Sequence, residues 1–231
     1  MNILAKLFKS SLGKKYLMAG SGAAMFLFVI GHMVGNLQIF LGAEQLNAYG
    51  HFLQSTPEIL WPARLGLLAM VGLHIWSAMK LSAENRAARP VPYAGTPAPL
   101  AASYASRTML MSGLIIASFL GYHLLHFTVL TPAINLTGQD FAKLTDAHGH
   151  HDVYRMMVTG FQHPVVAGFY VLAMALLCLH LSHGVSALFQ SLGLRSPTWN
   201  PVLDRFGCVA AWVIFLGFIA VPVAVLTGLV K

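Results

Sequence analysis

Histidines within apolar sequence are the residues of this chain whose positions call for a chemical explanation. The 231 residues include eleven histidines, and six of them lie within long apolar stretches: His32, His74, His123, His126, His180 and His183. Ionisable side chains are costly at membrane depth, and where they occur there they usually mark a functional site. One such histidine alone could equally pack between helices and bond a carbonyl. The positions of the six relative to one another therefore carry the information.

Counting residues along the apolar stretches sorts four of these histidines into two layers. At about 1.5 Å of rise per residue, His32 and His123 lie roughly 26 Å and 24 Å from the start of their stretches. His74 and His183 lie about 9 Å and 10 Å from the end of theirs, which run in the opposite direction. We therefore expect an outer pair, His32 with His123, and an inner pair, His74 with His183, about 15 Å apart. His126 and His180 each lie one turn from a member of a pair.

Two facing imidazoles suggest a particular cofactor. Neutral histidines opposed across a helix bundle suit the two axial positions of a haem iron. A zinc ion would ask for about four ligands, usually with help from cysteine or carboxylate. The apolar stretches contain no Asp or Glu, and Cys178 and Cys208 form no CxxC motif. The pattern predicts two stacked b haems, each held by two histidines.

The elements that must hold these histidines are membrane-spanning helices. Hydrophobic residues make up 57% of the chain and charged residues only 9%, too few to cover a soluble domain of this length. Asp, Glu, Lys and Arg are absent from five runs, bounded by Lys15 and Glu44, Arg64 and Lys80, Arg107 and Asp140, Arg155 and Arg195, and Arg205 and Lys231. A helix needs about 20 apolar residues to cross a membrane. We predict an all-α integral membrane protein, one domain over residues 1–231, with five transmembrane helices at about 15–41, 59–80, 107–131, 163–189 and 206–230. Four of them form the haem-binding bundle and the fifth packs outside it.

The basic residues indicate how these helices are oriented. If the N-terminus is cytoplasmic, ten Lys and Arg residues fall in inner segments and four in outer ones. This positive-inside bias predicts a C-terminus outside, and it accounts for the net positive charge without nucleic-acid binding. Between the helices we expect a Pro- and Ala-rich cytoplasmic connector at 88–103, large enough to touch a partner. On the outer side we expect a short interfacial helix within 43–58 and a polar loop at 135–156, whose histidines at 147–151 are solvated.

Four segments together resemble a known family. They are the run from SSLGKKYLMAG through VIGHMVGN, then WPARLGLLAMVGLHIWSAMKL, GYHLLHF and LSHGVSALFQSLGL. Together they are similar to the dihaem cytochrome b subunit of succinate dehydrogenases and fumarate reductases, in its single-subunit, five-helix type. The resemblance covers nearly all of the chain except the N-terminus and the 135–155 loop. It implies that the axial ligands are His32 and His123 for the outer haem and His74 and His183 for the inner one, so His126 and His180 are neighbours of ligands.

The resemblance also implies a function and partners. The chain would be a multi-pass subunit of a bacterial cytoplasmic (inner) membrane, in a complex that could form a higher oligomer. It would anchor a flavoprotein (FAD) subunit and an iron–sulfur subunit on the cytoplasmic side. Electrons from succinate would pass through those subunits to the inner haem, the outer haem and then a quinone, either menaquinone or ubiquinone. No residue of this chain would act on succinate.

A quinone site needs hydrogen-bonding groups near the outer layer and access to water. Candidate side chains on that side are Asn36, Gln38, Tyr49, His51, Glu58 and Arg64. Two other functions are considered. One is the dihaem anchor of another quinone-linked enzyme, such as a formate dehydrogenase or a hydrogenase. The other is a non-haem transporter with a histidine-lined path, which would predict acidic residues along a helical face, and the spans have none.

Overall fold

The computed structural model describes residues 3–91 and 103–231, and within these the chain is helical, apart from an isolated bridge between Thr145 and His151. The predicted connector at 88–103 lies mostly outside the described residues. The longer elements are α1 (Ile3–Lys9), α2 (Ser11–Leu37), α3 (Ala43–Gln54), α4 (Pro57–Ala87), α6 (Met109–Phe127), α7 (Val153–Gln162), α8 (Pro164–Ser191) and α9 (Asn200–Leu226). The short ones are η1 (Gln38–Leu41), α5 (Tyr104–Arg107), η2 (Pro132–Ile134) and η3 (Phe141–Lys143).

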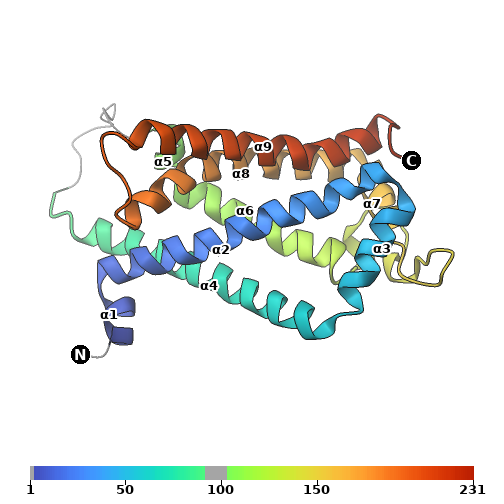
Figure 1. The fold of residues 1–231 in the computed structure, drawn as a ribbon, viewed down its shortest axis with the longest axis horizontal. Coiled ribbons are helices and arrows are strands. Elements are labelled where there is room, and N and C mark those ends of the chain that lie inside the picture. Colours follow the sequence, from blue (N-terminus) through green and yellow to red (C-terminus); the bar gives the residue numbers. More distant parts are fainter. Residues whose placement is uncertain (1–2, 92–102) are drawn as a thin grey trace.

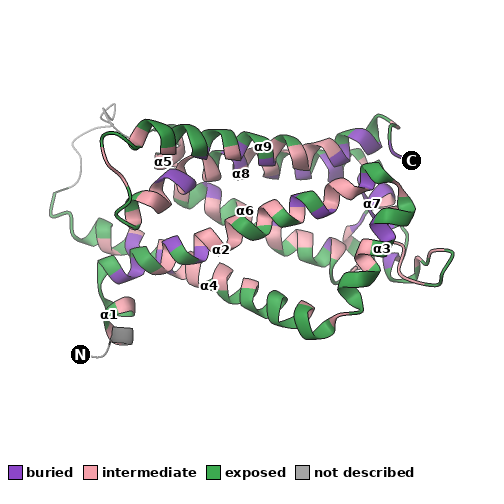
Figure 2. Cartoon of the chain, viewed as in Figure 1, coloured by how far each residue is buried: buried purple, intermediate pink, exposed green. Residues whose placement is uncertain are grey.

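Five of these helices are long and apolar enough to cross a membrane: α2 with η1, α4, α6, α8 and α9. They match the five predicted spans, and the chain is a multi-pass membrane protein. The helix ends differ because a helix continues past the apolar zone into water. Residues 81–87 prolong α4 beyond its predicted end, and residues 200–205 extend α9 at its start. Many apolar side chains on the bundle surface are exposed, as a lipid-facing surface requires, among them Leu27, Leu68 and Leu216 (Figure 2).

The long helices lie side by side, and the two chain termini lie at opposite ends of the bundle (Figure 1). We call these the α1 end, which also holds α5, and the α3 end, which also holds α7. Helix α9 packs chiefly along α8 and also contacts α2 and α7. It is not wholly outside the four-helix core, because the ring of Phe218 lies 5.9 Å from that of His32.

Ion pairs tie helices together at the α1 end. Lys14 on α2 is buried, and its Nζ donates to Glu84 of α4 at 2.7 Å. Arg195 donates to Asp204 of α9 at 2.7 Å and to the Ser186 hydroxyl at 3.0 Å. Removing the Glu84 carboxylate would leave the buried Lys14 ammonium without its opposite charge. The assignment of this end to the cytoplasm stays a prediction.

The α3 end is a folded cap, where the sequence suggested a polar loop. The expected short helix within 43–58 is confirmed as α3, but α7 was not anticipated. Asn47 of α3 donates to the Asp152 carboxylate at 3.0 Å and accepts from the backbone N–H of Tyr154 at 2.9 Å. His163 then has an extended backbone (ψ 114°) before Pro164, since proline disfavours a helical residue in front of it. This elbow separates α7 from α8.

Candidate functional site

The outer pair lies where the sequence predicted it. His32 of α2 and His123 of α6 have ring centres 5.8 Å apart, with planes at 78°. They lie near the α3 end, because His32 precedes the end of α2 by 37 − 32 = 5 residues and His123 precedes that of α6 by 127 − 123 = 4. Phe28 stacks on His32 at 5.4 Å. The two helices thus bring one imidazole each to a shared apolar space.

The inner pair differs from the prediction. The ring that faces His74 of α4 belongs to His180 of α8, with ring centres 6.3 Å apart and planes at 64°. In this structure His180, not His183, has its ring against that of His74, and the assignment of His183 as the inner ligand stays a prediction. His183 lies about 60° round the helix from His180, and its charged neighbours are Arg195 and Asp204. The prediction measured depth from Lys80, but α4 continues to Ala87.

Helix ends taken from the structure place His180 closer in depth to His74. His74 precedes the end of α4 by 87 − 74 = 13 residues, His180 precedes that of α8 by 191 − 180 = 11, and His183 by 191 − 183 = 8. His180 is therefore nearer in depth to His74 than His183 is. The choice between two histidines one helical turn apart depends on where each helix ends. Hydropathy alone does not define those ends.

Hydrogen bonds at Nδ1 define which nitrogen of each inner histidine is free. His74 Nδ1 lies 3.1 Å from the Met18 carbonyl oxygen, which can only accept, so Nδ1 carries the proton. His180 Nδ1 lies 3.2 Å from the Ser112 hydroxyl, whose own proton is donated to the Met109 carbonyl. Nδ1 of His180 is then also the donor. Both Nε2 atoms keep a lone pair, which is the form of histidine that binds a metal.

Two glycines, which we call the glycine seats, let the inner rings lie close against the backbone of neighbouring helices. A Cβ on Gly22 of α2 would lie 3.3 Å from Cε1 of His74, and a Cβ on Gly113 of α6 would lie 3.2 Å from Cε1 of His180. These glycines precede His32 and His123 by ten residues each, which is about 15 Å of helix. Helices α2 and α6 therefore each supply a histidine to the outer layer and a glycine seat to the inner one. This register places the rings of His74 and His180 about 15 Å along the bundle from the outer pair.

The ring centres are 5.8 Å apart in the outer pair and 6.3 Å apart in the inner pair, which is the spacing of aromatic rings in contact. Within the described residues, no group of three or more His, Cys, Asp and Glu side chains is arranged around a metal position. The donor sets are two-histidine sets, which suit haem rather than zinc.

Unpartnered polar atoms lie one turn from a histidine of each pair. The Ser77 hydroxyl follows His74 by three residues and is fully buried with no hydrogen-bond partner. His126 follows His123 by three, is also fully buried, and its Nε2 has no partner. Buried polar atoms are usually satisfied, so both positions fit a site that receives a further polar group.

The glycine seats allow a matched test. If each histidine pair holds a haem, Gly22→Val or Gly113→Val is expected to displace an inner imidazole and to lower the yield of the inner haem, while the outer haem is retained. Gly20→Val, on the same helix as Gly22, is the control, because a Cβ at Gly20 would meet no atom within 4 Å. The absorption of each purified variant, measured per chain, gives the result. Equal yields from Gly22→Val and Gly20→Val would contradict the role of the seat.

The six predicted quinone residues lie on α2, η1, α3 and α4. Asn36 donates to the carbonyl of His32, and Gln38 accepts from Gln45. Tyr49 packs against the backbone of Gly35. The remaining three are exposed: His51 stacks on His150 at 3.6 Å between ring centres, the Arg64 guanidinium lies over the Trp61 ring, and Glu58 begins α4.

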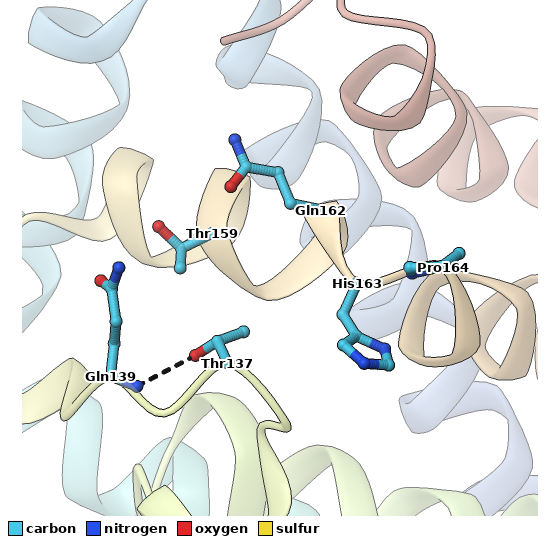
Figure 3. A pocket seen from close by; sticks show the side chains of 6 residues that line it. All are labelled: Thr137, Gln139, Thr159, Gln162, His163 and Pro164. Carbon is cyan, nitrogen blue, oxygen red and sulfur yellow. Dashed lines mark hydrogen bonds between the residues drawn. The ribbon is translucent and has the colours of Figure 1, made fainter.

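A cavity of about 260 Å³ lies at the same end, lined by other residues: Thr137, Gln139, Thr159, Gln162, His163 and Pro164. Figure 3 shows these side chains arriving from the 137–139 loop and from the α7–α8 elbow. The Nδ1 atom of His163 is buried and has no partner. Gly160 of α7 packs on His126, so the elbow borders the outer layer. Sequence reasoning missed this cavity because α7 was not expected.

The loop histidines form a surface contact with α3. Asp146 accepts from the backbone N–H groups of His148 and His150, each at 2.9 Å. Burial opposes the shift, but these two N–H groups hold the pKa of the Asp146 carboxyl below its usual range. His150 then stacks on His51, as described above. The backbone at 148 and 150 thus orders the loop, and the ring of His150 fastens it to α3.

Comparison with known proteins adds no relative. No protein-family model, no curated protein and no solved structure matches the chain.

Proposed function

We propose that the chain is the dihaem cytochrome b membrane anchor of a succinate:quinone oxidoreductase. The observation that carries the proposal is the pair of opposed histidine sets, His32 with His123 and His74 with His180, in two layers of one membrane bundle. The motif resemblance supports the particular complex. His180 replaces His183 as the inner ligand in this proposal, since His180 faces His74 and its Nε2 is free.

Two b haems would supply one-electron transfer between a soluble partner and the membrane quinone. The chain's own residues hold and orient them. Met18 and Ser112 fix the protons of the inner histidines on Nδ1, and Gly22 and Gly113 let their rings lie against helix backbone. Apolar helices keep water away, so that burial and hydrogen bonding tune each potential.

The soluble partners would bind at the α1 end, beside the inner pair. Exposed cations gather there, including Lys9, Lys15 and Arg86. If this end is cytoplasmic, as the positive-inside bias indicates, a flavoprotein and an iron–sulfur subunit would meet the bundle closest to the inner pair. The chain itself would carry out no succinate chemistry.

The quinone ring would bind at the α3 end, and the pocket at the elbow is favoured because the buried His163 Nδ1 has no hydrogen-bond partner there. His163→Ala is expected to raise the KM for quinone about fivefold, the scale of one lost hydrogen bond, with haem content unchanged. His148→Ala, an exposed loop histidine at the same end, is the control. If His163→Ala were silent while Tyr49→Phe raised the KM, the site would lie between α2 and α3 instead.

Electron donors separate the proposed complex from its rivals. In anaerobic membranes that contain the chain with its native partners, succinate is expected to produce a reduced b-type spectrum. Reduction by formate or hydrogen, and not by succinate, would assign the chain to another quinone-linked enzyme. A chain without any b-type spectrum would instead favour the transporter.

A further inference from the structure

A single tyrosine hydroxyl contacts both histidines at the end of α6. Tyr170 of α8 lies 3.3 Å from Nδ1 of His123 and 3.0 Å from Nδ1 of His126, measured from its hydroxyl oxygen. Its side chain is 7% exposed and His126 is 0% exposed. The ring of Tyr170 also packs against Phe119, Phe127 and Phe161. The hydroxyl is therefore held in place between the two imidazoles.

We propose that Tyr170 is a positioning residue for the outer haem, which presents His123 in its metal-binding tautomer and sets the reduction potential of that haem. This inference rests on the proposed function. It concerns a side chain that sequence reasoning did not single out. Tyr170 lies on α8, a helix that supplies neither histidine of the outer pair.

The protons in this contact follow from the ligand role of His123. If Nε2 of His123 binds iron, Nδ1 must carry the proton and donate it to the Tyr170 oxygen. The Tyr170 hydroxyl has one proton, which is then donated to Nδ1 of His126. In the reverse arrangement the proton of His123 would sit on Nε2 and block iron. The hydrogen bonds therefore run from His123 through Tyr170 to His126.

The direction of the effect on potential follows from the same hydrogen bond. An acceptor at Nδ1–H makes a ligating imidazole more basic, which favours the oxidised iron and lowers the potential. The donation from Tyr170 to His126 strengthens the tyrosine oxygen as an acceptor, because linked hydrogen bonds polarise one another. At the inner pair, a backbone carbonyl and a serine take the place of the tyrosine. Tyr170 should thus act on the outer haem alone.

The test is Tyr170→Phe in the intact complex, followed by a potentiometric titration of its b-haem absorption. Two haems per chain should be retained, and the outer component, defined as the one lost in His32→Ala, should become easier to reduce by about tenfold, or 59 mV for one electron. The inner component should not move. Tyr122→Phe is the matched control, because the Tyr122 hydroxyl is in the same aromatic cluster but donates to the Ile134 carbonyl.

Other outcomes discriminate further. An unchanged outer potential in Tyr170→Phe, or an equal shift in Tyr122→Phe, would overturn the proposal. If Tyr170→Phe lost both haems through misfolding, His126→Phe would decide, since it keeps the tyrosine but removes its acceptor and should raise the outer potential less than tenfold; no shift there would overturn the proposal. Absence of haem from the wild-type chain would instead refute the proposed function.

Discussion

Replacing His180 with alanine is expected to remove one of two b haems from the chain, whereas replacing His183 should leave both. Only His180 has its ring opposed to that of His74, and its Nδ1 is engaged by Ser112, which leaves Nε2 free. The charged side chains that act on His183 are those of Arg195 and Asp204. Loss of an axial ligand should reduce inner-haem occupancy by well over tenfold, since even an outer-shell partner of a metal ligand contributes about 10–100-fold.

The two histidines form a matched pair on one helix, one turn apart. Both variants should be purified in the same detergent and their haem measured per chain by the pyridine haemochrome method. His74→Ala should reproduce the His180→Ala spectrum, since both remove the inner component. Retention of two haems in His180→Ala together with loss of one in His183→Ala would restore the pairing inferred from sequence.

Replacing His32 or His123 with alanine is expected to remove the outer haem and to reduce succinate-driven quinone reduction by at least about 100-fold. The proposed route reaches the quinone through the outer layer, so its loss interrupts transfer rather than weakening it. The inner haem should still be reduced by succinate, because its ligands His74 and His180 lie about 15 Å away along the bundle.

The control for the outer variants is Phe28→Leu. Phe28 stacks on His32 and shares its surroundings, but it can bind no metal. It should retain both haems and most of the quinone reductase rate. A His123→Ala variant with two haems and normal turnover would contradict the outer assignment. Loss of both components in His32→Ala would show that the two layers do not bind independently.

Much of the fold could be predicted because membrane crossing is a strong physical constraint. The runs without charge gave all five spans, and depth gave the outer pair, since His32 and His123 both lie near helix ends that hydropathy places well. At the inner pair, depth counted from hydropathy favoured His183, whereas depth counted from the helix ends favours His180, because α4 continues to Ala87, past the last apolar residues. A shift of one helical turn was enough to exchange His180 for His183.

The missed features depend on contacts between helices. Gly22 and Gly113 are common residues in membrane helices, and only the rings that lie on them give them a role. In the sequence Tyr170 is one more aromatic residue in an apolar run. Only the structure shows that its hydroxyl lies between two histidines. Helix α7 has a buried apolar face, but its sequence adjoins polar loop residues and the histidine cluster. The elbow at His163 and Pro164 could have suggested a separate helix there.

The haem content of the purified wild-type chain tests the central claim most directly. A pyridine haemochrome assay, with protein determined by amino-acid analysis, is expected to give two b haems per chain. The reduced-minus-oxidised spectrum should resolve into two components, one lost with His32 or His123 and the other with His74 or His180. No b haem, or only one per chain, would contradict the account.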